Sequence, residues 1–239
     1  PAFALRADEV QHLFPATKPS NVLRYLPYVA AALTSEGLTT IPLILAALGT
    51  IRAETEGFVP ISEYPSQFNT LPGLPAFSAY DVGTDKGKNL GNINPGDGAR
   101  FRGRGFVQLT GRSNYQKYAS RIGVDIIGSP DLANAPEVAA VLLAMFLGDR
   151  REALTAALTA TPPDYRKARR LVNGGAHGLD SFKKVFTLAA VLPAVMQQTS
   201  QIQGAGAGRG SRQQAGAAAI AAPAEGPVLN ASKDPLDLR

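Results

Sequence analysis

The chain has 239 residues and a mass of 25.0 kDa, which allows one sizeable domain, or a domain followed by a tail. Hydrophobic residues make up 45% of it, enough for a core. Cysteine is absent and there are only two histidines, which excludes disulfides and a cysteine nucleophile and leaves little for a metal centre. No apolar run approaches the about 20 residues of a membrane span, and Pro1 opens no secretion signal, so we expect no membrane insertion.

The N-terminal part of the chain predicts two helices. The first is expected over 20–35, where Pro27 should kink it. The second follows the capping residue Thr40 and runs to Gly57. The stretch 57–99 is then rich in Gly, Pro, Asn and Asp, and a connection of this length inside a domain is uncommon unless it carries function.

The rest of the domain is also predicted to be mainly helical. A short β-leaning piece at 105–110 precedes the expected helices, which span 113–123, 136–148, 164–172 and 179–196. Residues 197–239 contain no aromatic residue but hold 10 Ala and 6 Gly. We therefore predict a folded domain over 1–196 and an Ala/Gly/Gln-rich flexible tail or linker over 197–239.

Two carboxylates flank the start of the loop-rich stretch. Glu54 ends the second helix and Glu63 follows nine residues later, with Gly57 and Pro60 between them to interrupt the helix. The chain can therefore swing Glu63 back across a cleft, whereas two unrelated surface glutamates would leave the same pattern. A carboxyl separation of roughly 6.5–9.5 Å would suit inverting glycoside hydrolysis, since it leaves room for a water molecule.

Several short motifs accompany these glutamates in a fixed order. They are AETEGF (53–58), LGN (90–92), GDG (96–98), RGRGFVQLTGRSNY (102–115) and NGG (173–175). Together, over about 41–185, they resemble the glycoside hydrolase family 19 domain of chitinases and of lysozyme-like endolysins. This resemblance implies a mainly α, lysozyme-like, two-lobed fold with a substrate cleft and long functional loops, and a reaction that inverts the anomeric carbon without metal or cofactor.

The resemblance also implies roles for individual residues. Glu54 matches the general acid, Glu63 the general base, and Thr110 the residue that helps to hold the attacking water. Polar positions that line the sugar-binding cleft match Gln108, Asn114 and Asn173. Tyr115 is a further candidate for substrate binding because its ring could stack on a sugar, although such a tyrosine most often packs in the core.

The chemistry sets expectations for the surroundings of the two glutamates. A general acid must hold a proton when it acts, so Glu54 should lie among apolar side chains or beside a second carboxylate. Arginines from the segment 100–112 are expected to keep Glu63 ionised. Two positions depart from the family pattern: Ala53 stands where many relatives carry His, and Phe182 where an Arg is expected.

Other patterns favour no second activity. The segment 103–108 lacks the third glycine of a dinucleotide loop, and 81–89 lacks the closing Glu of a calcium loop. The sequence contains no nucleophile elbow, so His177 is not expected to belong to a catalytic triad. The basic run 166–170 is typical of a solvated helix face, and nucleic-acid binding would rest only on the net charge of +5 and the pI of about 9.6.

The sequence therefore predicts an enzyme that hydrolyses β-1,4 bonds between N-acetylhexosamine units by endo cleavage with inversion. Chitin and peptidoglycan both fit as substrates, and the basic body favours anionic peptidoglycan. The alternative is a wall-polysaccharide-binding protein that kept the cleft and lost turnover. We expect a monomer that needs no cofactor, binds no nucleic acid and acts on cell-wall or extracellular polysaccharide.

Overall fold

The computed structural model describes residues 5–191, and these residues form a mainly helical domain. Its elements are α1 (Ala7–Leu13), α2 (Pro19–Ser35), α3 (Ile41–Thr55), β1 (Ile61–Ser62), η1 (Ser78–Tyr80), α4 (Asp85–Asn89), α5 (Asp97–Arg100), β2 (Arg104–Gly105), α6 (Arg112–Ile122), η2 (Pro130–Asn134), α7 (Pro136–Gly148), α8 (Arg151–Leu158), α9 (Tyr165–Asn173) and α10 (Leu179–Ala189). The tail predicted over 197–239 lies outside the described residues. No helix in the described range has the length and hydropathy to cross a membrane.

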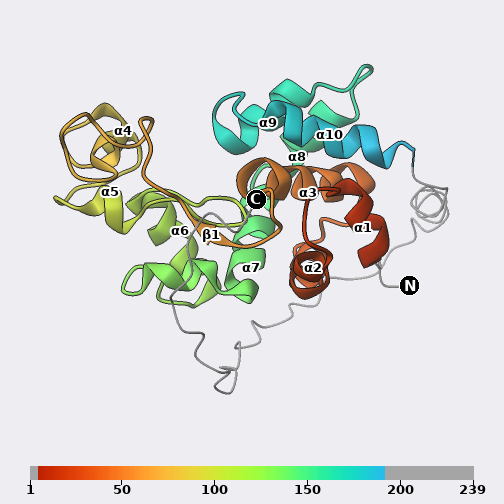
Figure 1. Cartoon of the computed structure of the whole chain (residues 1–239), viewed down its shortest axis with the longest axis horizontal. Helices are drawn as coiled ribbons and strands as arrows, with labels where there is room; N and C mark the ends of the chain where they lie inside the picture. The colour runs from red at the N-terminus through yellow and green to blue at the C-terminus, as the bar shows by residue number, and fades with distance from the viewer. Residues whose placement is uncertain (1–4, 192–239) are drawn as a thin grey trace, which may run out of the picture. The chain divides into compact units, whose positions relative to one another are not determined.

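The core is built around α3. Residues on all sides of this helix are buried, as its nearly uninterrupted apolar sequence predicts. It lies between α8, α9 and α10 on one side and α7 on the other (Figure 1). Helix α10 approaches closely at Gly49, where a Cβ atom would come within 2.9 Å of the Phe182 ring. A larger side chain at position 49 would therefore push α10 away from the helix that carries Glu54.

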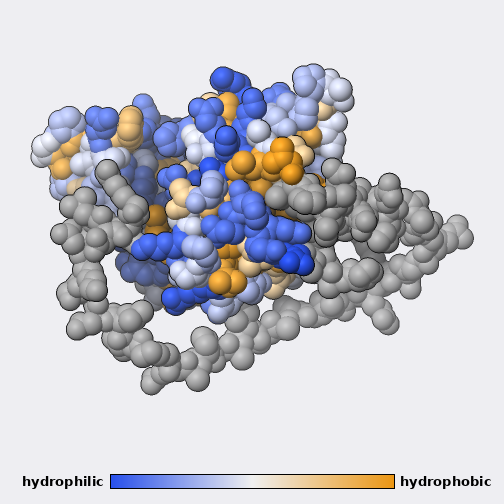
Figure 2. Space-filling model, turned by 45° about the vertical axis from the view of Figure 1, so that its right-hand side comes forward, coloured by the Kyte–Doolittle hydropathy of each residue, from blue (hydrophilic) through white to orange (hydrophobic). Residues whose placement is uncertain are grey.

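The predicted helices are found, with differences at their edges. Helix α2 includes Pro27 and continues to Ser35, and it packs onto α7. Helices α1 and α8 were not predicted, since seven or eight residues are too few for a helical pattern to stand out in the sequence. Hydrophilic residues cover most of the face shown in Figure 2, and hydrophobic residues form small patches between them.

The strand predicted over 105–110 is wrong except at its first residue. Strands β1 and β2 form a two-stranded antiparallel pair in which Ile61 faces Gly105. The chain turns back directly after Gly105, so that Leu109 pairs with Arg104 across an isolated bridge. Gln108 has a φ of 51°, which an extended strand does not allow. This turn projects the residues after it towards β1.

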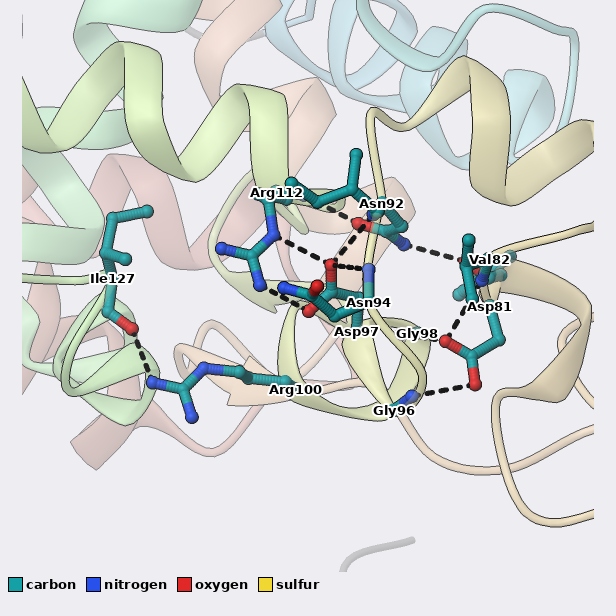
Figure 3. Close-up of polar contacts among 12 residues, drawn as sticks. Asp81, Val82, Asn92, Asn94, Gly96, Asp97, Gly98, Arg100, Arg112 and Ile127 are labelled. Carbon is teal, nitrogen blue, oxygen red and sulfur yellow. Dashed lines mark hydrogen bonds and ion pairs between the residues drawn. The ribbon is translucent and has the colours of Figure 1, made fainter.

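The loop-rich stretch 57–99 forms, with α4 and α5, the part of the domain on the left of Figure 1. The carboxylates of Asp97, which is buried, and of Asp81, which is half-buried, hold it together (Figure 3). Asp97 accepts hydrogen bonds from the Arg112 guanidinium at 2.5 and 2.7 Å and from the backbone N–H groups of Ile93 and Asn94. Asp81 accepts from the Gly96 N–H at 2.8 Å. Side-chain carboxylates thus replace the backbone ladders that this irregular segment lacks.

Candidate active site

Both predicted glutamates line one open cleft of about 1010 Å³. The walls come from the end of α3, the segment after β1, α4, the turn after β2, and the end of α9. Six of the seven residues predicted for the site line it, namely Glu54, Glu63, Gln108, Thr110, Asn114 and Asn173. Within the part of the chain that the structure describes, no group of three or more His, Cys, Asp or Glu side chains is placed to hold a metal ion.

The turn between Glu54 and Glu63 is held by contacts with residues from the N-terminal part of the chain. Helix α3 ends at Thr55, and the backbone carbonyls of Glu56 and Gly57 accept hydrogen bonds from Thr17 and Asn21. Phe58 is fully buried with a φ of 56°, and packing of its ring against Phe14 at a centroid distance of 4.9 Å offsets this unfavourable backbone angle. The break that the sequence predicted is therefore a rigid turn that brings Glu63 to the cleft.

Glu54 is held by a buried arginine from α9. Arg169 Nη2 donates to Glu54 Oε1 at 2.7 Å, and Asn173 Nδ2 lies 3.3 Å from the same oxygen. The Arg169 side chain is 0% exposed and that of Glu54 is 11% exposed. Arg169 Nε also donates to the carbonyl of His177 at 2.7 Å, which ties the turn after α9 to the end of α3.

Burial of Arg169 corrects the prediction that 166–170 is a solvated helix face. Ala168, Arg169 and Val172 form the buried side of α9, while the other basic residues of the run are exposed. The spacing of Ala168 and Val172 marks this side, and Arg169 lies next to it on the helix. A helical projection of the sequence could therefore have identified Arg169, but not its partner on α3.

Glu63 is held by neutral donors only. Its Oε1 accepts from Asn69 Nδ2 at 2.9 Å and from the Tyr80 hydroxyl at 2.8 Å, and its Oε2 accepts from the Gly103 N–H at 3.1 Å. The expectation of an arginine partner is wrong: Arg112 pairs with Asp97. A carboxylate that accepts three hydrogen bonds keeps a fixed orientation without a neighbouring cation.

Tyr80 and Asn69 are site residues that the sequence did not reveal. Burial raises the pKa of Tyr80, and the adjacent Glu63 carboxylate raises it further, so the hydroxyl remains a proton donor. The Asn69 side chain is almost fully buried and also donates to the Tyr64 carbonyl at 2.8 Å. Both residues lie in the irregular stretch after Glu63, where no periodicity indicates which side chains point inward.

Polar side-chain atoms of Glu63, Gln108 and Thr110 converge at Gly103. A Cβ atom placed there would lie 2.8 Å from Gln108 Oε1, 3.1 Å from Glu63 Oε2 and 3.2 Å from Thr110 Oγ1. Gln108 uses its amide nitrogen on the carbonyls of Ile61 and Gly105, which turns its oxygen towards this point. The absence of a side chain at position 103 therefore lets three polar atoms converge.

Comparison with known proteins places this geometry in a known fold. Chitinase C from Streptomyces griseus HUT6037 superposes with a TM-score of 0.53 at 15% sequence identity, covering 80% of this chain and 78% of that one. The chain has the same mainly helical fold as this chitinase. A crystal structure described as that of a bacterial family 19 chitinase gives a TM-score of 0.48 at 19% identity over 79% of this chain and 96% of that one.

The likeness in sequence is confined to a short segment. Chitinase 8 of Oryza sativa subsp. japonica is 44% identical over 46 residues, which are 19% of this chain and 18% of the rice protein. No protein-family model matches the chain. The fold predicted from the ordered motifs is therefore confirmed by structure, although little of the sequence is shared.

Tyr115 does not reach the cleft, so its prediction as a substrate-binding residue is wrong. Its side chain is 0% exposed. The hydroxyl donates to the Arg102 carbonyl at 3.0 Å and accepts from Arg104 Nη1 at 3.1 Å, and the ring packs on Phe101. Tyr115 lies on the buried side of α6 together with Tyr118, so the usual core role of such a tyrosine is the one found.

The structure shows what surrounds Phe182 and Ala53, the two positions at which the sequence departs from the family pattern. Phe182 is buried and packs against Gly49 of α3 and Phe186, while Arg169 supplies an arginine to Glu54 from a different helix. Ala53 accommodates the turn after α9, because a Cβ atom at Gly178 would lie 3.0 Å from that of Ala53. A histidine at position 53 would have less room beside this turn.

Proposed function

We propose that the protein is a glycoside hydrolase that cleaves β-1,4 bonds in polymers of N-acetylhexosamine, of the chitin or peptidoglycan type. The observation that carries this proposal is the placement of Glu54 and Glu63 in one cleft with different partners. The family 19 chitinase fold supports it, because the chitinases of this fold cleave such polymers.

In the proposed mechanism, Glu54 protonates the leaving oxygen and Glu63 removes a proton from the attacking water. Tyr80 and Asn69 occupy Oε1 of Glu63, so that Oε2, which faces Gln108 and Thr110, is the oxygen that takes the proton. Thr110 and Gln108 offer further oxygen atoms to the same water. Attack from the side opposite to the leaving group inverts the anomeric carbon.

The test is digestion of an N-acetylglucosamine hexamer followed by NMR. We expect the first new reducing ends to be α-anomers, and we expect Glu54→Gln and Glu63→Gln each to lower kcat by about 10²–10⁴-fold. Glu56→Gln is the matched control, because Glu56 is exposed and is absent from the cleft wall.

Three outcomes would contradict the proposal. First-formed β-anomers would exclude inversion. Full activity of Glu54→Gln would exclude its role as the acid, and equal losses in Glu56→Gln would show that the effect is one of folding or surface charge.

A second candidate function is polysaccharide binding without turnover, and the ion pair between Arg169 and Glu54 favours it. A carboxylate in an ion pair is deprotonated, so Glu54 must take up a proton before it can act as a general acid. Binding of the hexamer by the wild type, with no reducing ends released at any pH between 4 and 8, would establish this function in place of hydrolysis.

A further inference from the structure

A basic hollow of about 450 Å³ lies on α9 next to the cleft. Three of its lining residues are cations of this helix, and the full lining is Asp164, Arg166, Lys167, Arg170, Leu171 and Gly174. Arg166, Lys167 and Arg170 are exposed, whereas Arg169 of the same run is turned into the core. The sequence run therefore divides into one buried residue that serves Glu54 and three that face solvent.

Among the described residues, no acidic side chain forms an ion pair with any of the three exposed cations. The one carboxylate in the hollow, that of Asp164, accepts the Lys167 backbone N–H at 2.8 Å and caps α9. The hollow thus keeps a net positive charge, and an anion bound there would meet cations that are free to pair.

The hollow is continuous with the cleft. Gly174 lines both of them, and Asn173, directly before it, lines the cleft and contacts Glu54 Oε1. Helix α9 itself packs beside α3, which carries Glu54 (Figure 1). A polymer bound across Glu54 and running past Asn173 would place its next substituents against Lys167 and Arg170.

We propose that this hollow is an accessory subsite for carboxylate groups carried by the polymer, so that the protein prefers N-acetylhexosamine chains with acidic substituents over neutral ones. The inference rests on the proposed function, because the cleft must hold the polymer for the hollow to meet its substituents. The lining residue Gly174, which the hollow shares with the cleft, favours a substituted polysaccharide over a nucleic acid. Chitin itself carries no anionic group with which these cations could form an ion pair.

The test compares two soluble derivatives of one polymer, carboxymethyl chitin, which is anionic, and glycol chitin, which is neutral. We expect the wild type to show a lower KM for carboxymethyl chitin. Lys167→Gln/Arg170→Gln should reduce this preference by about 3–10-fold, and raising the salt concentration to about 0.5 M should do the same in the wild type.

The control variant is Lys18→Gln/Arg24→Gln, which removes the same two residue types from exposed positions at α2, outside the cleft and the hollow. It should keep the wild-type preference. If both variants lose this preference equally, the effect is one of net charge and the subsite proposal is overturned. A wild type that does not distinguish the two polymers would also overturn it. Displacement of carboxymethyl chitin by duplex DNA at lower concentration than by more polymer would overturn it in favour of a nucleic-acid patch.

Binding measured with Glu54→Gln separates this proposal from the proposed function. If the wild type cleaves neither polymer but Glu54→Gln still binds carboxymethyl chitin more tightly, and Lys167→Gln/Arg170→Gln abolishes that difference, the subsite holds and hydrolysis fails. If glycol chitin is cleaved and bound as well as carboxymethyl chitin, hydrolysis holds and the subsite fails.

Discussion

At the scale of single residues, the two glutamates differ in what holds them. Arg169 contacts Glu54 from a helix that lies 115 residues further along the chain, whereas Glu63 is fixed by the nearby Asn69, Tyr80 and Gly103. A base that takes a proton from water gains from neutral donors, which orient it without competing for the proton. Of these donors, the Tyr80 hydroxyl is the one that can be removed with the least change to the rest of the site.

Tyr80→Phe tests this arrangement. The variant loses the 2.8 Å hydrogen bond to Glu63 Oε1 and keeps the ring. Because this hydrogen bond helps to hold the Glu63 carboxylate in one orientation, we expect kcat to fall about 3–10-fold with little change in KM. Tyr64→Phe, at an exposed neighbouring position, should leave kcat unchanged. Equal losses of kcat in both variants would contradict the role of Tyr80.

At the scale of elements, α5 and the loops around it depend on a carboxylate network instead of on a hydrophobic face. Asp97, at the start of α5, joins the backbone of 93–94 to Arg112 of α6 (Figure 3). Burial alone would raise the pKa of Asp97, but the hydrogen bonds from Arg112 and from the two backbone N–H groups outweigh it and lower the pKa to about 2. The part of the domain that carries Tyr80 is thus stabilised by an ionised side chain.

Asp97→Asn tests the network through its pH dependence. A pKa of about 2 in the folded state lies below the unfolded value, so this stabilisation is present above about pH 4 and is lost as the pH falls through 2. At pH 7 the variant should be less stable than the wild type by about 2–4 kcal/mol in urea unfolding, and the difference should narrow between pH 4 and pH 2. The exposed Asp85→Asn should show little change. A difference that stays constant down to pH 2 would contradict an ionised Asp97.

At the scale of the whole molecule, the domain closes with α10. Phe182 and Val185 of this helix are 0% exposed and pack towards α3, the helix that bears Glu54. The composition of 197–239, with few large apolar residues, predicts no comparable contribution from the C-terminal segment.

Truncation tests where the domain ends. A protein of residues 1–196 should keep the Tm and the specific activity of the full chain. One of residues 1–178 should fail to fold, because it loses the side chains of α10 that cover α3. A fall in Tm of more than about 3 °C for the longer protein would show that the C-terminal segment supports the fold.

The sequence by itself determined the mainly helical fold, the break after Glu54 and six of the residues that line the cleft. These follow from local properties, since apolar periodicity, Gly and Pro act over a few residues and the ordered motifs mark one architecture. Gln108, Thr110, Asn114 and Asn173 were predicted to line the cleft because they belong to these motifs.

Only the tertiary structure decided which groups hold the glutamates and which candidate is buried. Arg169 meets Glu54 across 115 residues, Tyr80 and Asn69 reach Glu63 from irregular loops, and Tyr115 turns its ring into the core. Such contacts depend on how helices pack and loops close, and they leave no periodic trace in the chain. Burial in the folded domain leaves the polar atoms of Arg169 and Asn69 few partners other than these side chains, which is why the pairs form there.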